Sequence, residues 1–481
     1  MYKLDIESRW FLLIGLVLFF LVAKEAYTVP LTHDEYNTIF CSQTSIWDII
    51  TYKDPVPNNH ILNTLLLKLN IAVFGDQLFT NRLHNFLFFI PFYWFTILVS
   101  RLLFKSVWLR VTLVLLIAFQ PFLLDFFAVT RGYGLSVTFQ MISLYYFIKR
   151  IKDGDQKYIL LSLFWAALGV YANFTLLNYF IPLLVLFSID SIRKLYRTNK
   201  ALMVREIGFM MAIASILFLM IIVPVQKMVQ TKQFVYWGNK GFFEDTVKQL
   251  IISMRSGVEY FGTSNESVYV LVLGFISVIF AAGIFFLRQL KNKDFHIYFC
   301  SILLLIILYN ITQFYILDIP FLNARTALFF IPIVAITFSL SLESILNYSK
   351  TAGLILIVLV NSLVVQHFIR GFNVKVIQEW YYDQNTFEVL EFLKHLAESG
   401  QVPKPVKVNC YWIFYPSLRY HVDHGFSEFI ELAPYDTKID NDMQSTFYYT
   451  ESSEKDKLLS RFDIIQEYGW GSRIIMKAKT Q

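Results

Sequence analysis

An acidic pair lies in the polar stretch that follows the first long apolar segment of the chain. Asp34 and Glu35 come directly after Thr32 and His33. Ionisable groups beside hydrocarbon are costly to desolvate, which makes them candidates for a functional site. A carboxylate there can take a proton from an acceptor hydroxyl or amine as that group attacks. We therefore expect Asp34 to be a general base, although an acidic pair is also typical of a solvated loop.

Polar side chains continue in the same loop. The run from residue 54 to residue 60 reads Asp-Pro-Val-Pro-Asn-Asn-His, and its Asn58, Asn59 and His60 offer donors and acceptors suited to sugar hydroxyls or phosphate oxygens. The same run is typical of a Pro-Asn turn that caps a following helix at 60–73, and one stretch can serve both roles. Arg82 stands at the start of the next apolar segment and adds a guanidinium.

Two further arginines stand alone at the edges of apolar segments, in the runs Arg131-Gly132-Tyr133 and Asn323-Ala324-Arg325. A guanidinium can hold a phosphate with two parallel hydrogen bonds. Alternatively, each arginine has no binding role, and its long side chain only reaches from the membrane edge to water. Together with the acidic pair, these arginines predict a site for an anionic, lipid-linked substrate.

The composition places these residues in an integral membrane protein. Of 481 residues, 56% are hydrophobic and only 16% are charged, whereas soluble domains carry about a quarter charged residues. The net charge of +6 is modest, and no basic stripe alternates with aromatics as a nucleic-acid surface requires. Three cysteines without CxxC spacing indicate neither a disulfide framework nor a zinc site. Whether Cys41 and Cys410 form a disulfide is not decided by the sequence.

Eleven apolar segments are candidates for crossing the bilayer, which takes about 20 mostly apolar residues. They are expected at 10–28, 84–104, 108–127, 132–149, 158–173, 175–190, 207–226, 267–288, 296–317, 325–344 and 352–371. We therefore expect a mostly α-helical, polytopic membrane bundle.

Basic residues orient these segments. Clusters at 101–110, 149–157, 193–205 and 288–293 all fall on one side if the N-terminus is cytoplasmic. Segments 29–83, 227–266 and 372–481 then lie outside. Arg131 and Arg325 would also lie outside. The bias toward positive charge on the cytoplasmic side does not explain arginines there.

Smaller elements are predicted in the external segments. Apolar residues at helical spacing in 29–83 and 242–258 predict amphipathic helices on the membrane surface. The tail predicts a helix at 386–398 with Thr386 as its N-cap, and strands at 406–413, 445–450, 462–467 and 473–477. The last two strands are predicted to form a hairpin through 468–471. We expect two domains, a membrane domain at 1–371 and a small extracytoplasmic α/β domain at 372–481.

The candidate residues resemble the GT-C superfamily of integral membrane glycosyltransferases, most closely the branch of protein O-mannosyltransferases and bacterial aminoarabinose transferases. The resemblance rests on Asp34-Glu35 after the first span, on Asn-Asn-His where many relatives have His-Pro-Pro, on Arg82, and on the runs 131–133 and 324–325. It covers residues 10–190 well and later residues thinly. The order and placement of these motifs carry it, since none is specific alone.

The resemblance implies a polyprenyl-phosphate sugar as donor, an external active site on a bacterial inner or plasma membrane, and inversion at the anomeric carbon. The acceptor, a lipid, a glycan or a protein, stays open. No cofactor is required, although some members of the superfamily use a divalent metal, which Asp34 and His60 could ligate. Membrane lipids are expected partners and nucleic acids are not.

Residue roles follow from the same resemblance. Asp34 would be the general base, and Glu35 would support it or position the acceptor. The donor phosphate and sugar would be held by Arg131, Arg325, Arg82, His60, Asn59 and Tyr133.

Two other classes of protein stay open. A transporter or lipid flippase often has inverted repeats and broken spans; no repeat is evident here, although prolines interrupt several spans. A polysaccharide ligase or polymerase would use a late external loop, and in 227–266 the candidate residues would be Trp237, Glu244, Asp245 and Arg255.

Overall fold

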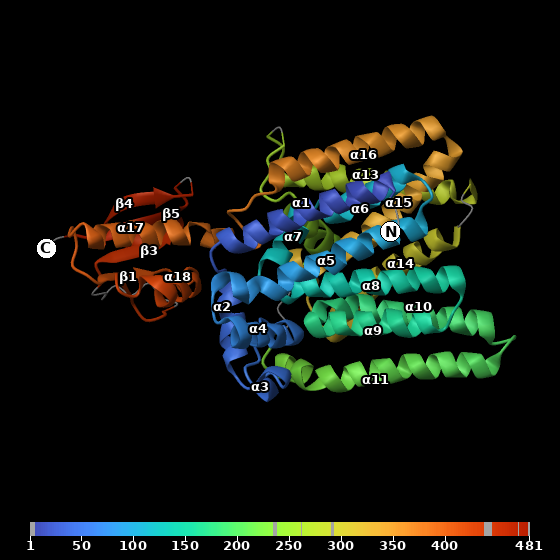
Figure 1. Cartoon of the computed structure of the whole chain (residues 1–481), viewed down its shortest axis with the longest axis horizontal. Coiled ribbons are helices and arrows are strands. Elements are labelled where there is room, and N and C mark those ends of the chain that lie inside the picture. The colour runs from blue at the N-terminus through green and yellow to red at the C-terminus, as the bar shows by residue number, and fades with distance from the viewer. Residues whose placement is uncertain are drawn as a thin grey trace.

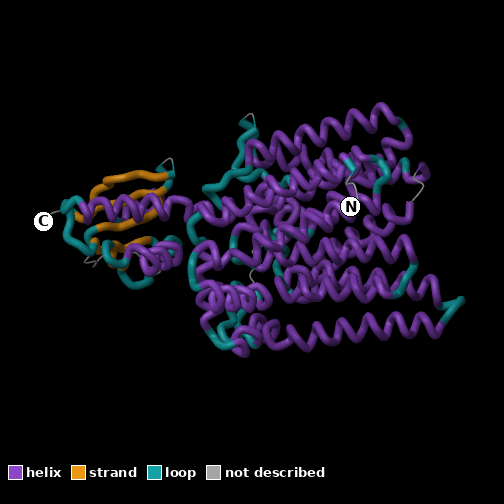
Figure 2. Tube along the Cα trace, in the orientation of Figure 1, coloured by secondary structure: helices purple, strands orange, loops and turns teal. Residues whose placement is uncertain are grey.

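A long helical bundle makes up most of the molecule, and a small sheet with its helices lies at one end of it (Figure 1). The computed structural model describes residues 5–233, 238–260, 262–289, 293–436, 445–469 and 471–479. Figure 2 shows that the strands lie together in the small region, while the bundle consists of helices and their connections.

Twelve helices form the described part of the bundle, most of them aligned with its long axis (Figure 1). They are α1 (Ile6–Thr28), α5 (Leu78–Leu103), α6 (Val107–Ala118), α7 (Pro121–Ala128), α8 (Gly132–Asp153), α9 (Lys157–Ala172), α10 (Leu177–Leu195), α11 (Lys200–Gln230), α13 (Asn265–Phe285), α14 (Lys293–Leu317), α15 (Phe330–Tyr348) and α16 (Lys350–Gly371). Each of the eleven expected spans falls on one of these helices or on the α6–α7 pair.

The described helices include eight that are long and apolar enough to cross a membrane, or nine if the pair α6–α7, bent by 56°, counts as one span. The difference from eleven lies in α8 and α9. α9 has only 16 residues. α8 is long enough but carries polar side chains that find partners inside the bundle: Gln140 donates to the Phe329 carbonyl at 2.8 Å, and the Ser143 hydroxyl contacts that of Tyr179 at 3.0 Å. The chain is an integral multi-pass membrane protein.

The amphipathic elements predicted in segments 29–83 and 242–258 are present as helices. The first loop holds α2 (His33–Gln43), α3 (Ile46–Ile50) and α4 (Ile61–Phe74), and the later loop holds η2 (Phe242–Val247) and α12 (Lys248–Met254). Apolar side chains of these helices are exposed, among them Phe40, Trp47, Leu69, Val73 and Phe243. Their placement on the membrane surface stays a prediction.

The tail forms a five-stranded sheet in the order β2-β1-β3-β5-β4. The strands are β1 (Val406–Cys410), β2 (Ile430–Leu432), β3 (Phe447–Glu451), β4 (Phe462–Tyr468) and β5 (Arg473–Ala478). β1 pairs in parallel with β2 and β3, while β5 is antiparallel to β3 and β4. The predicted hairpin is thus confirmed as β4–β5, and Trp470 of its turn lies outside the described residues.

Helix α17 (Thr386–Glu398) buries its apolar face against this sheet, where Val389, Leu390 and Leu393 join a core that includes β1 and β3. Its predicted bounds are confirmed, but Asn385 and not Thr386 is the N-cap, because Thr386 already has helical geometry. Strand β2 and helix α18 (Tyr415–His421) were not predicted. The cysteines are all free, so Cys41 and Cys410 form no disulfide. The division of the chain at 371/372 stays a prediction.

Candidate active site

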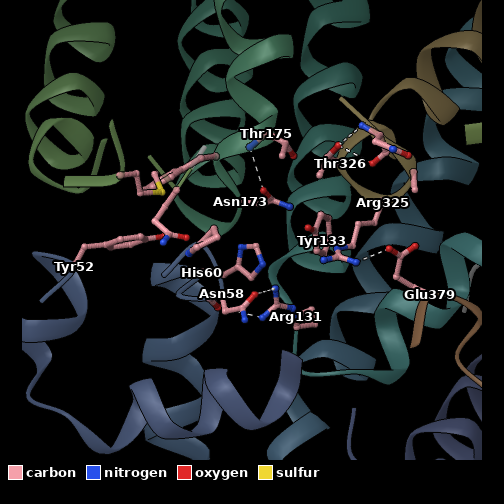
Figure 3. Close-up of a pocket in the computed structure, with 16 residues that line it drawn as sticks. Tyr52, Asn58, His60, Arg131, Tyr133, Asn173, Thr175, Arg325, Thr326 and Glu379 are labelled. Atoms are coloured by element: carbon pink, nitrogen blue, oxygen red, sulfur yellow. Dashed lines mark hydrogen bonds and ion pairs between the residues drawn. The ribbon is translucent and has the colours of Figure 1, made fainter. Parts of the chain in front are cut away.

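A cavity of about 260 Å³ lies where the first loop, the turn between α9 and α10, and the segment after α16 meet. Figure 3 shows its polar residues converging from these separate elements. The polar residues that line it include Asn58, His60, Arg131, Tyr133, Asn173, Arg325 and Glu379. The cavity therefore gathers residues from both ends of the sequence.

Asp34 lies in the first turn of α2; it does not line this cavity itself but contacts two arginines that do. Its Oδ2 atom is 3.2 Å from a guanidinium nitrogen of Arg325 and 3.6 Å from one of Arg131. Its Oδ1 atom accepts a hydrogen bond of 3.4 Å from the Asn58 amide. Burial raises the pKa of Asp34, but the Arg131 and Arg325 guanidiniums lower it more, so the pKa lies below its ordinary value. The carboxylate is therefore ionised at neutral pH.

Arg325 is the more exposed of the two arginines at Asp34, with 28% of its side chain open. It belongs to the short helix η4 (Ala324–Ala327), and Ala324 before it has a φ of +47°, a left-handed conformation that alanine rarely adopts. The guanidinium also pairs with Glu379 and lies over the Trp380 ring, 5.1 Å from its centre. Arg325 thus reaches the cavity with its charge accessible to a ligand.

Arg131 also lines the cavity, but most of its donors bind protein groups. One terminal nitrogen donates to the Asp34 carbonyl, the Thr38 hydroxyl and the Asn58 carbonyl, at 3.2, 2.8 and 3.1 Å. The other donates to the Asn58 side-chain oxygen at 3.0 Å. Arg131 is almost fully buried. It therefore fixes Asp34 and Asn58, and its own donors are largely occupied.

Glu35 and Arg82 form a separate, sealed pair, and neither lines the cavity. Arg82 donates to Glu35 at 2.6 and 2.8 Å, and both side chains have 0% exposure. Arg82 also donates to the carbonyls of Ala26, Val29 and Pro30 at 2.8–3.0 Å. Glu35 accepts in addition from the backbone N–H of Thr130 at 2.7 Å. The pair ties the first loop to α1 and to the start of α8.

His60 lines the cavity, whereas Asn59 does not. The Asn59 amide donates to the Ile49 carbonyl at 2.9 Å, which closes the turn before α4. Burial and then the Arg131 and Arg325 charges lower the pKa of His60 well below its ordinary value, so its ring is neutral. The His60 Nε2 atom is buried without a partner among the described residues. It is therefore available to a substrate hydroxyl.

Tyr133 packs edge-on against His60, with ring centres 5.2 Å apart, and lines the same cavity. The adjoining Gly132 makes this packing possible, since a Cβ there would lie 2.9 Å from His60 and 2.0 Å from the Ala172 carbonyl. The Arg-Gly-Tyr run thus places Arg131 and Tyr133 on either side of a glycine that must stay small.

Comparison with known proteins gives a structural match only. No family model matches the chain, and neither does any curated protein. The crystal structure of apo ArnT from Cupriavidus metallidurans is similar with a TM-score of 0.52 and 9% sequence identity, over 98% of each chain. The chain has an ArnT-like fold. The structure of the same protein bound to undecaprenyl phosphate has a TM-score of 0.49 and 10% identity, over 98% of this chain and 99% of that one.

The ArnT-like fold confirms the expected fold class, a mostly helical membrane bundle with a small C-terminal sheet region. It extends the likeness beyond the first 190 residues, where the sequence motifs are concentrated, because the match spans nearly the whole of both chains.

Several cavity residues were not predicted. Glu379 belongs to η5 (Gln378–Asn385), the segment that leads from α16 to the sheet, and Asn173 lies in the turn before α10. The Asn173 side-chain nitrogen is buried without a partner among the described residues. Asn58, by contrast, was predicted together with Asn59 and His60, and it lines the cavity whereas Asn59 does not. A polar residue in an otherwise apolar helical turn was the available signal for Asn173.

The residues considered for a ligase or polymerase lie elsewhere. Glu244 pairs with Lys248 at 2.6 Å, Asp245 accepts from the backbone N–H of Lys240 and Gly241, and Arg255 donates to the Val258 carbonyl. None of the three lines the cavity, and Trp237 lies outside the described residues.

The described residues contain no group of three or more His, Cys, Asp or Glu that could hold a metal ion. The Asp34 carboxylate is engaged by two guanidiniums and an amide. A metal at Asp34 and His60 has no geometric support here, and metal dependence stays a prediction.

Proposed function

We propose that the protein is a glycosyltransferase that moves a sugar from a polyprenyl-phosphate donor to an acceptor on the external membrane face. One observation carries this proposal: Asp34 and Arg325, 291 residues apart in the sequence, contact each other, and Arg325 lines a polar cavity. A carboxylate beside an accessible guanidinium suits a reaction in which a proton is removed and a phosphate departs. The ArnT-like fold agrees with this reaction class.

The donor phosphate is proposed to bind Arg325. This arginine is the accessible cation of the described cavity, and its guanidinium can accommodate two phosphate oxygens. Arg131, which also lines the cavity but is almost fully buried, adds its positive charge. Arg82 stays a predicted phosphate ligand without supporting geometry, since all its contacts are to buried protein groups.

The sugar is proposed to lie between Arg325 and the polar atoms of His60, Asn173 and Asn58. The unpartnered His60 Nε2 and Asn173 amide nitrogen can bond sugar hydroxyls, which would relieve the cost of leaving buried polar atoms unsatisfied. Tyr133 packs against His60 and fixes its ring.

The proposed reaction is a single displacement with inversion. The acceptor oxygen or nitrogen forms a bond to the anomeric carbon as the bond from that carbon to the phosphate oxygen breaks. The proton of the acceptor passes to the Asp34 carboxylate, and the electron pair leaves with polyprenyl phosphate, whose charge Arg325 stabilises. Movement of Arg325 toward the phosphate frees Asp34 Oδ2 for this proton, because that atom now contacts the guanidinium. Glu35 would act indirectly, by fixing the turn that carries Asp34.

Mass spectrometry of envelope lipids and glycans tests the proposal. Cells that carry the wild-type protein, no protein, or Asp34→Asn are compared. We expect one sugar addition to disappear from the acceptor, and the lipid-linked sugar to accumulate, in both of the last two strains. Identical spectra in all three strains would refute the proposal.

The orientation proposed with this function places the cavity and the sheet outside the cytoplasm. Ser399 and Asp155 are both exposed and lie in the sheet region and at the start of α9, respectively. In intact cells, a membrane-impermeant thiol reagent should label Ser399→Cys, and it should label Asp155→Cys only after permeabilisation. Labelling in the opposite order would reverse the topology.

A further inference from the structure

The segment that follows the last bundle helix closes one side of the cavity. Two hydrogen bonds hold it: the Gln378 N–H donates to Asp125 of α7 at 3.1 Å, and Asp383 accepts from the His33 N–H at 2.8 Å. Between these anchors, Glu379 lines the cavity and the buried Trp380 supports Arg325. The segment therefore holds a carboxylate at a fixed place beside the proposed phosphate site.

Arg325 lies between two carboxylates that differ in their other partners. Asp34 keeps Arg131 at 3.6 Å and Asn58 at 3.4 Å if Arg325 moves away. Glu379 has Arg325 as its one ion-pair partner among the described residues. Burial raises the pKa of Glu379, and although Arg325 lowers it, the pKa stays above the ordinary value. Glu379 thus depends on Arg325 more than Asp34 does.

On the basis of the proposed function, we propose that Glu379 is a positioning residue that competes with the lipid-linked phosphate for Arg325. In the empty site Glu379 holds the guanidinium. The donor phosphate displaces Glu379, and after transfer Glu379 recaptures Arg325, so that polyprenyl phosphate leaves.

The charges of donor and product give a reason for such a competitor. The donor is a phosphodiester with one negative charge, whereas the product is a monoester with a charge of about −1.5 to −2 at neutral pH. A guanidinium suited to the donor therefore holds the product more tightly. Product release limits turnover in many enzymes, and a carboxylate within reach of the same guanidinium lowers the affinity for the product.

The experiment measures binding of polyprenyl phosphate to the purified full-length protein in nanodiscs, together with single-turnover and multiple-turnover rates. Glu379→Gln keeps a hydrogen-bonding side chain but removes the charge. We expect it to bind polyprenyl phosphate about 3- to 10-fold more tightly and to lose multiple-turnover rate, with little change in the single-turnover rate. A merely structural role would instead weaken binding and slow both rates.

Matched variants sharpen the result. Glu244→Gln removes a carboxylate paired with Lys248 outside the cavity and should change nothing. Glu379→Asp keeps the charge with a shorter reach and should have intermediate affinity; it also serves if Glu379→Gln fails to fold. In an Arg325→Ala background the effect of Glu379→Gln on binding should vanish, because Glu379 and the phosphate no longer have a guanidinium to compete for.

The outcomes separate this inference from the function on which it rests. If Glu379→Gln binds polyprenyl phosphate with unchanged or weaker affinity while wild type transfers sugar and Asp34→Asn does not, the role of Glu379 is refuted and the proposed function stands. If wild type neither binds polyprenyl phosphate nor transfers sugar, both fail.

Discussion

Asp34 and Glu35 are neighbours in the sequence, yet their carboxylates occupy two different environments. Glu35 pairs with Arg82 where both side chains have 0% exposure, and its remaining hydrogen bonds go to backbone N–H groups. Asp34 pairs with Arg325, which lines the cavity, and the two side chains are 12% and 28% exposed. The two pairs have the same chemistry and differ in their access to a ligand.

The difference follows from the position of each residue in the first turn of α2. Glu35 completes a capping box with Thr32, which turns its carboxylate back toward the chain that leaves α1. Asp34, one residue earlier, contacts Arg131 at the start of α8 and Arg325 of η4, and both of these arginines line the cavity. A sealed pair fixes structure, whereas an open pair can exchange partners with a substrate.

The largest expected effect is a loss of turnover when the open pair of Asp34 and Arg325 loses its carboxylate. Asp34→Asn should lower the transfer rate by about 10²- to 10⁴-fold, the usual contribution of a general base. Because Asn keeps the size and one oxygen of Asp, the thermal stability of the purified protein should stay close to wild type. Turnover near the wild-type level would remove Asp34 from the proposed mechanism.

The sealed pair should give the opposite profile. Arg82→Ala leaves the Glu35 charge buried and unpaired, which costs about 3–5 kcal/mol. Denaturant unfolding in detergent should reveal this loss. The double variant Glu35→Gln, Arg82→Met should regain part of the stability, because no buried charge then lacks its partner. If Arg82→Ala unfolds like wild type but cannot bind polyprenyl phosphate, Arg82 belongs to the donor site after all.

The long helices could be predicted because apolar runs and basic clusters are local properties of the sequence. The span count was harder, since α8 satisfies Gln140 and Ser143 through partners that only the folded bundle supplies. In the tail, α17 was visible from the spacing of its apolar residues. The three-residue strand β2 was not, because it depends on pairing with β1.

The site was predictable where charge stands out from apolar surroundings. Asp34, Arg131 and Arg325 were found in this way, and the structure brings them together. Arg82 is just as conspicuous in the sequence, but no local pattern reveals that Glu35 occupies its guanidinium. Glu379 was missed because it stands in an acidic tail, and its place beside Arg325 depends on the path of the chain after α16.

The next effect in size concerns the two arginines that contact Asp34. Arg325→Ala should weaken binding of polyprenyl phosphate about 10- to 100-fold, as expected for the loss of charge-assisted hydrogen bonds worth about 1.5–3 kcal/mol. Arg131→Ala should weaken binding less and reduce turnover more, because its guanidinium holds Asp34 and Asn58. Calorimetric titration and initial rates separate the two. Equal losses of affinity would mean that Arg131 binds the phosphate directly.

A third ion pair is more exposed to solvent than the other two, and its removal should have the smallest effect on stability. His424 of the sheet region lies 3.4 Å from Asp76 of the first loop, with side chains 35% and 26% exposed. The hydrogen bond to Asp76 raises the pKa of His424 above its ordinary value. A raised folded-state pKa stabilises the fold fully below the unfolded value, near 6.5, and this contribution is lost as pH rises through the folded value.

The thermal unfolding temperature should therefore fall slightly above pH 6.5, by about 1 °C or less, since exposed pairs contribute little. His424→Gln should remove this pH-dependent part and leave the stability at pH 8.5 unchanged. Scanning fluorimetry between pH 6 and 9 measures both. A second histidine of the sheet region, His421, accepts a hydrogen bond from the Leu31 N–H of the first loop. Burial lowers the pKa of His421 to about 3, so its ring is neutral throughout this pH range. An equally steep decline in His424→Gln would assign the pH dependence to another group and leave the exposed pair without a measurable role.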